Sequence, residues 1–120
     1  MTKEHKPFVE WNFARKRDEW MRRLSMVPQS KISSGAKIVA FRISLYMHDA
    51  KRRAHPTFPA LAKACGMSER MVQEHTKTLS DWIEVDRRRN KGNTYWLKYP
   101  FVDESNGSVV PLETEADFVD

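Results

Sequence analysis

Hydrophobic residues between Phe58 and Leu79 are spaced to form two short helices joined by a tight turn. In the first, over residues 58–65, the apolar positions recur at helical intervals and make one face: Phe58, Leu61, Ala62 and Cys65. Gly66 follows directly, where a left-handed residue without a Cβ ends a helix at low cost. Thr57 and Ser68 can cap the two helices, and the second has an inner face of Val72, Thr76 and Leu79. Helices joined by so short a turn cross steeply, which is the geometry of a helix-turn-helix.

The first half of the chain is predicted to form two longer helices. One extends from Val9 to Met26, after a polar arm at residues 1–8, and places three apolar side chains on one side: Phe13, Trp20 and Leu24. Pro28 ends it, because proline restricts the preceding residue and cannot continue the backbone ladder. Ser33 or Ser34 can cap a second helix through residues 35–50, which is apolar almost all round and is therefore expected at the centre of the core.

Two β-prone runs, residues 82–86 and 94–99, flank a polar segment that contains Asn and Gly, and together they predict a β-hairpin. Ile83 and Val85 alternate with Glu84 and Asp86, so one face of the first strand is expected to be buried. After Pro100, acidic residues, Ser, Asn and Gly dominate, and a flexible tail is predicted from Val102.

The stretch HPTFPALAKACGMSERMVQEHTKTL, followed by WIEVDRRRNKGNTYWL, resembles the winged helix-turn-helix domains of short bacterial, phage and plasmid regulators and replication initiators. The resemblance covers Ile32 to Leu97. It implies an α+β fold in which residues 32–101 form a three-helix core with a β-hairpin wing. Residues 1–31 would add an arm and an N-terminal helix, and residues 102–120 a flexible acidic tail. His75 departs from the family pattern, which usually buries an aliphatic residue there; we expect its ring to turn inward and hydrogen-bond in the core. Ser80–Asp81 replace the usual Gly before the wing.

The charge distribution favours a polyanionic partner. The whole chain carries a formal charge of +5. Its last 19 residues hold six carboxylates and no Lys or Arg, so the 21 basic and ten remaining acidic residues give residues 1–101 a net charge of +11. A basic body of this kind is typical of nucleic-acid-binding proteins, although basic surfaces also serve solubility or acidic protein partners.

The resemblance implies binding to double-stranded DNA, with residues 68–79 as the recognition helix in the major groove. The outward positions of this helix are its candidate contacts: Ser68, Glu69, Arg70, Gln73, Glu74 and Lys77. Arg70 can make a bidentate contact to guanine and Gln73 to adenine. Glu69 and Glu74 would be repelled by phosphate, and Glu74 stands where an ordinary surface ion pair with Arg70 is the alternative. Met71 is assigned to the core together with Val72 and Leu79.

The wing, residues 87–93, carries a run of cations suited to phosphates or to a narrow minor groove: Arg87, Arg88, Arg89 and Lys91. Asn93 and Tyr95 match the family's Asn-x-Tyr pattern, so Asn93 is expected to shape the turn or contact DNA and Tyr95 to pack under the wing. Lys31 and Lys37, near the start of the second helix, are further candidates for a backbone phosphate.

Three functions remain open on these residues. The first is a transcriptional regulator acting as a homodimer, since one short helix reads few base pairs. The second is an origin-binding protein of the replication-initiator type, which would use the same contacts. The third is a winged-helix protein-interaction module. Trp11 and Trp20 supply more apolar surface than the first helix needs, and this surface packs either within the chain or at a dimer seam.

No catalytic, cofactor or metal site is expected. Cys65 lies on an apolar helix face and is predicted to be a buried structural thiol. His48, Asp49 and His55 lack the spacing of a metal site, and the glycines do not form a phosphate-binding loop. No run is long enough to span a membrane, and the N-terminus lacks an apolar signal region. With a single cysteine, a cytoplasmic, nucleoid-associated protein is expected.

Overall fold

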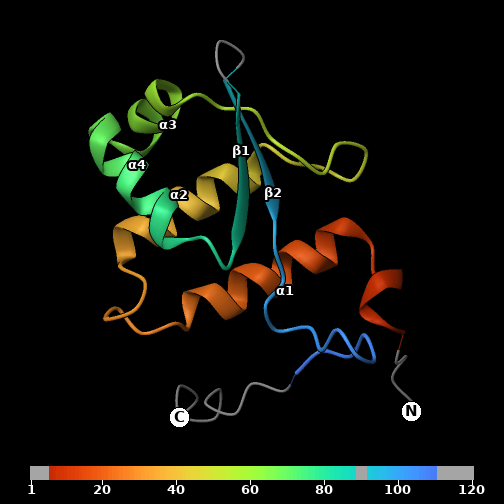
Figure 1. Cartoon of the computed structure of the whole chain (residues 1–120). Helices are drawn as coiled ribbons and strands as arrows, with labels where there is room; N and C mark the ends of the chain where they lie inside the picture. Colours follow the sequence, from red (N-terminus) through yellow and green to blue (C-terminus); the bar gives the residue numbers. More distant parts are fainter. Residues whose placement is uncertain (1–5, 89–91, 111–120) are drawn as a thin grey trace.

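The computed structural model describes residues 6–88 and 92–110, which form helices and one β-hairpin (Figure 1). The elements in chain order are a 3-10 helix η1 (Phe8–Glu10), α1 (Phe13–Ser25), α2 (Ser34–Leu45), α3 (Phe58–Cys65), α4 (Glu69–Thr78), β1 (Ile83–Arg88) and β2 (Gly92–Leu97). The predicted α+β class is therefore confirmed. None of the helices in the described part of the chain is both long and apolar enough to cross a membrane.

Each α-helix begins at a polar side chain that caps it. The cap oxygens of four residues accept a hydrogen bond from the backbone N–H three positions on: Asn12, Ser33, Thr57 and Ser68. The predicted caps at Ser33, Thr57 and Ser68 are confirmed. Gly66 adopts a φ of 68° directly after α3, so the predicted left-handed turn is confirmed as well.

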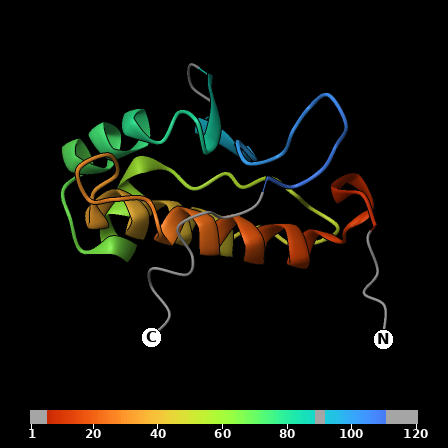
Figure 2. The same ribbon diagram turned by 90° about the horizontal axis from the view of Figure 1, so that it is seen from below.

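Helix α2 forms the centre of the core, as its pattern predicted. It contacts α1, α3 and α4, and its inward positions have no exposed surface: Ala36, Val39, Ala40 and Ile43. The helix ends at Leu45, earlier than predicted, because Tyr46 becomes its C-cap and His48 and Lys51 pair as an isolated antiparallel bridge. Figure 2 shows α1 on one side of the molecule and the hairpin with α4 on the other.

The hairpin pairs β1 and β2 antiparallel, from Ile83 opposite Leu97 to Arg88 opposite Gly92. Its second strand has a further partner, which the sequence did not predict. Ala54 and Tyr95 exchange two backbone hydrogen bonds, of 3.0 and 2.8 Å. This bridge ties the segment before α3 to the other edge of β2. A one-residue bridge has no periodicity from which it could be predicted.

The two ends of the described chain pack together, and Phe8 departs from the predicted polar arm. The Phe8 ring is 6% exposed and lies against the rings of Tyr99 and Phe101, with centroids 4.8 and 5.8 Å away. The Phe8 N–H donates to the carbonyl of Gly107 (3.4 Å). Residues 102–110 turn back on themselves through a bridge between Val102 and Val109.

Phe8 is buried and so does not belong to the predicted polar arm, because burial of its ring outweighs the polar local sequence. None of residues 102–110, which were predicted to form a flexible tail, is buried. Residues 1–5 and 111–120, to which the same predictions applied, lie outside the described part. Helix α1 also begins later than expected, at Phe13, since Asn12 caps it and the exposed Val9 belongs to η1.

Trp20 lies in the core and not at the surface. Its side chain has no exposed area, its Nε1–H donates to the carbonyl of Trp82 (3.0 Å), and its ring meets Phe41 edge-on. It therefore cannot form the dimer seam that the sequence left open. Trp11 is half-buried, and the guanidinium of Arg15 lies 3.7 Å from its ring centre.

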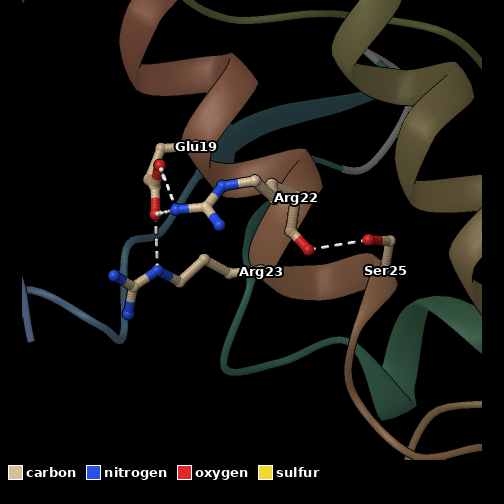
Figure 3. Close-up of polar contacts among 4 residues, drawn as sticks. All are labelled: Glu19, Arg22, Arg23 and Ser25. Atoms are coloured by element: carbon tan, nitrogen blue, oxygen red, sulfur yellow. Dashed lines mark hydrogen bonds and ion pairs between the residues drawn. The ribbon is translucent and has the colours of Figure 1, made fainter. Parts of the chain in front are cut away.

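An ion-pair network at the end of α1 holds the segment that follows β2 (Figure 3). Glu19 Oε2 accepts from Arg23 Nε at 2.6 Å and from Arg22 Nη2 at 2.9 Å. The Ser25 hydroxyl donates to the carbonyl of Arg22 (2.7 Å), within the same turn. Arg23 is buried, and its guanidinium lies 4.8 Å from the Phe101 ring centre. Burial alone would raise the pKa of Glu19, but the two arginines outweigh it and hold that pKa below its usual value.

Replacing Trp20 with Phe should destabilise the chain without changing its oligomeric state. The variant removes the hydrogen bond to Trp82 and leaves a void, so we expect a loss of about 2–3 kcal/mol in the free energy of unfolding. Urea denaturation and sedimentation of the same samples measure both quantities. Trp11→Phe is the control and should cost less, because Trp11 is half-exposed. An unchanged stability with an altered oligomeric state would contradict the buried placement.

Replacing Glu19 with Gln should reduce stability in a pH-dependent way. The folded pKa of Glu19 lies below its unfolded value, so its contribution is present above the unfolded pKa and is lost as pH falls through the folded one. We expect the variant to be less stable by about 2 kcal/mol at neutral pH. The difference from wild type should vanish in acid. The exposed neighbouring Asp18→Asn variant should show no comparable change, and a pH-independent difference for Glu19→Gln would refute the role of its charge.

Candidate nucleic-acid interface

The α3–α4 pair is built on a turn that leaves one side of α4 free. The carbonyl of Ala62 accepts from the N–H groups of both Gly66 and Met67, which closes the left-handed turn. Both helices then bury their inner faces against α2, through Leu61, Ala62, Val72, Thr76 and Leu79. This packing fixes which side of α4 faces solvent.

The structure places most of the predicted contact residues along the exposed side of α4. Four are exposed on the helix itself: Glu69, Arg70, Glu74 and Lys77. Gln73 is half-buried. Ser68 is exposed, but its hydroxyl oxygen already accepts from the N–H of Met71 as the helix cap (3.1 Å). The Arg70 side chain is 88% exposed, the property that a base-reading arginine needs.

Arg70 and Glu74 form the surface ion pair that was the alternative interpretation of their spacing. Arg70 Nε lies 3.6 Å from Glu74 Oε2, and the Glu74 side chain is 64% exposed. A pair so open to water contributes little to stability and can be exchanged for another partner. The two carboxylates and two cations of this side also cancel in charge, so attraction to a polyanion must come from elsewhere in the chain.

Met71 is exposed, which contradicts its assignment to the core. Its side chain is 48% accessible to solvent. Val72 points inward, and adjacent residues on a helix are rotated by about 100° from each other, so Met71, which precedes Val72, lies on the outer side. An apolar group therefore lies beside Arg70 on this side of α4. Such a group can pack against a thymine methyl in the major groove.

His75 sets how closely α4 approaches α2. Its Nε2 is buried with no hydrogen-bond partner, so the expected core hydrogen bond is not formed within the described residues. The ring lies over Gly35 in the first turn of α2, where an added Cβ would stand only 2.8 Å from Nε2. A side chain at Gly35 would therefore force the imidazole to shift, and the absence of a Cβ gives the ring its room.

The hairpin lies next to the start of α3. The guanidinium of Arg87 is 5.2 Å from the ring centre of Phe58, a cation–π contact that holds the end of β1 near the α3 N-terminus. Arg88 is the last residue of β1, opposite Gly92. Arg89 and Lys91, the other predicted cations of the hairpin, lie outside the described residues.

Asn93 and Tyr95 hold each other in the hairpin. Asn93 Nδ2 donates to the Tyr95 hydroxyl oxygen (3.1 Å), and the Tyr95 ring has no exposed surface. The predicted packing of Tyr95 beneath the hairpin is confirmed. Burial raises the pKa of Tyr95. The amide of Asn93 is thus engaged in shaping the strand.

Lys37, a candidate for a phosphate contact, also has a structural role. Its Nζ donates to the carbonyls of Val27 (2.5 Å) and Ser25 (3.1 Å). These carbonyls end α1, where a cation is favoured by the helix dipole. Lys31 is exposed and stays a candidate.

The residues considered for a metal site are not brought together in the described part of the chain. Over residues 6–88 and 92–110, no three His, Cys, Asp or Glu side chains gather where they could hold a metal ion. His55 Nδ1 lies 3.1 Å from the Thr94 hydroxyl, whereas Asp49 accepts from the Phe13 N–H and from Arg52. Cys65 is half-buried, and burial raises the pKa of its thiol.

Comparison with known proteins gives no relative for this chain: no protein-family model, no curated protein and no solved structure matches it.

The contact between Gly35 and His75 predicts that Gly35→Ala changes stability differently with and without the imidazole ring. Alanine is the better helix former by about 1 kcal/mol, so Gly35→Ala should stabilise a His75→Ala background. In the wild type the new Cβ would meet the imidazole, and the same substitution should be neutral or destabilising. Denaturation of the four proteins in this double-mutant cycle measures the coupling. Equal effects of Gly35→Ala in both backgrounds would show that the ring does not constrain this approach.

Proposed function

We propose that this chain binds double-stranded DNA as a winged helix-turn-helix domain, with α4 in the major groove and the hairpin as the wing. The observation that carries the proposal is the exposed side of α4, on which Arg70 extends into solvent beside Met71. A helix is the element that fits the major groove, and residues near its N-terminus reach base edges. Both residues lie in the first turn of α4.

The proposed contacts divide into those that read bases and those that bind the backbone. On α4, Arg70 would contact guanine, with Gln73, Met71 and Lys77 as secondary contacts. The carboxylate of Glu74 would have to exchange Arg70 for the DNA or meet a cytosine amine. Arg87, Arg88 and the remaining hairpin cations would contact flanking phosphates or the minor groove. Because the exposed side of α4 is neutral, the hairpin and the charge of +11 on residues 1–101 would supply most of the electrostatic affinity.

Within this proposal, we favour the role of a transcriptional regulator over that of an origin-binding replication initiator. Both would gain specificity by binding as more than one copy, because a single short helix reads few base pairs. A homodimer remains part of the proposal, but its seam cannot include Trp20. The exposed apolar residues Ile38 and Leu45 on α2 are available for such a contact. The same residues support the alternative of a protein-interaction module.

Selection from a random duplex library, followed by titration of the selected site against salt, tests the proposal. We expect a defined consensus and a steep loss of affinity with salt. Arg70→Ala should weaken binding by roughly 1–3 kcal/mol and relax specificity at one base pair. Arg87→Ala should weaken binding to all sequences alike and reduce the salt slope by about one.

Arg15→Ala is the matched control, because it removes the same charge from the first turn of α1, away from α4 in both views of the molecule (Figures 1 and 2). It should leave the consensus unchanged. A palindromic consensus would support a dimeric regulator and tandem repeats an initiator. Binding without sequence preference, or equal effects of Arg70→Ala and Arg15→Ala, would refute recognition by α4 and favour the protein-interaction alternative.

A further inference from the structure

A cavity of about 190 Å³ lies away from α4, between the start of α1, the loop after α2 and the end of β2. In Figures 1 and 2 these segments lie on the far side of the hairpin from the α3–α4 pair. The cavity is lined by Phe13, Lys16, Arg52, Trp96, Leu97 and Tyr99. None of these residues belongs to the DNA contacts proposed above.

The floor of the cavity is aromatic and apolar. Phe13 and Leu97 are buried beneath it, whereas the Trp96 and Tyr99 rings are half-buried and line it. Burial raises the pKa of Tyr99 to about 12, so its hydroxyl is neutral at physiological pH and can donate a hydrogen bond. Half-buried aromatic rings of this kind are surfaces on which a planar ring can stack.

The rim of the cavity brings two cations together with too little negative charge to balance them. Arg52 is paired with Asp49 at 3.0 Å, and that carboxylate also accepts from the Phe13 N–H. Lys16 has no carboxylate partner among the residues that the structure describes. Burial, and then the charge of Arg52, lower the pKa of Lys16. An anion placed between Lys16 and Arg52 would relieve this repulsion.

The neighbouring cation Arg17 differs from Lys16 in its partners. Arg17 also lies near the Phe13 ring, but its Nη1 donates to the carbonyls of Met47 (3.1 Å) and Ser44 (3.4 Å) at the end of α2. Arg17 is thus engaged in ending a helix, whereas Lys16 lies over an aromatic ring, with its Nζ 5.3 Å from the Phe8 ring centre. The unbalanced positive charge is therefore concentrated on the rim.

We propose that this cavity binds a nucleotide, with the base stacked on Trp96 and Tyr99 and the phosphate held between Lys16 and Arg52. The cavity is smaller than the roughly 300–1,000 Å³ of pockets that enclose an organic ligand, so a nucleotide would be held by its base and its phosphate, with the rest of the molecule in solvent. The nucleotide has two possible sources that share this chemistry: a free mononucleotide, or one unit of a single strand. The site is independent of α4, so it can exist whether or not the chain reads duplex DNA.

Calorimetric titration of the full chain at low salt tests the proposal, with adenosine monophosphate as the first probe. Adenosine and inorganic phosphate separate the two halves of the ligand, and a single-stranded oligoadenylate represents the strand. Saturable binding of the mononucleotide, tighter than that of either half, is expected. Lys16→Gln should weaken it by about tenfold, the usual effect of losing a charged hydrogen bond. Trp96→Leu should weaken the mononucleotide but not inorganic phosphate.

Arg53→Gln is the matched control, because Arg53 is an exposed cation of the same loop that does not line the cavity. It should bind the probe like the wild type, and thermal melting of each variant shows whether it is folded. An oligonucleotide that binds far more tightly than the mononucleotide identifies the strand as the source, and equal affinities identify the free nucleotide. The proposal would be overturned if neither adenosine monophosphate nor the oligoadenylate bound saturably, or if Lys16→Gln and Arg53→Gln had equal effects. Loss of duplex binding by Arg70→Ala would not affect the nucleotide proposal.

Discussion

The hydrogen bond from the Trp20 indole to the carbonyl of Trp82 joins the first helix of the chain to the residue that begins the hairpin. Its donor and acceptor are 62 residues apart, and the indole is completely buried between them. The same carbonyl also accepts from the N–H of Lys98 (2.8 Å), so one oxygen atom joins α1, the residue before β1 and the residue after β2. The bridge to Ala54 and the contact between Arg87 and Phe58 then attach the hairpin to the segment before α3 and to α3 itself.

The position of α4 depends on a second close contact, between the His75 ring and the backbone of Gly35. A buried imidazole nitrogen without a partner reduces stability, and an aliphatic residue would avoid that cost. Gly35 makes room for the ring but offers Nε2 no hydrogen bond. Together with the Gly66 turn, this contact sets the angle and depth at which α4 lies on the core, and hence which residues it exposes. In the proposed function, these inward contacts position Arg70 without touching DNA.

The exposed side of α4 and most of the positive charge lie on different parts of the molecule. The exposed side of α4 carries equal numbers of acids and cations, so it contributes little long-range attraction to a polyanion. Cations that the acids of α4 do not balance include those of the hairpin, of α1 and of the loop after α2, where several lie against aromatic rings, as Arg87 does against Phe58. Affinity and specificity in the proposed complex would thus reside on different elements. The cavity beside the start of α1, with Lys16 and Arg52, shows the same association of cations with aromatic side chains.

Local sequence determined the α3–α4 pair and the hairpin, because their caps, their glycine turn and their apolar spacing depend on residues a few positions apart. Residues 58–65 and the caps at Thr57 and Ser68 were predicted correctly for this reason. The exposed residues of α4 followed from the same periodicity, except Met71, which lies at the edge of the apolar face. What the sequence could not determine depends on contacts between distant residues. Trp20 was left between core and surface, Phe8 was placed in a polar arm, and Lys37 was only a candidate for a phosphate contact. Only the tertiary structure decided these, since each depends on a partner that folding brings near from elsewhere in the chain.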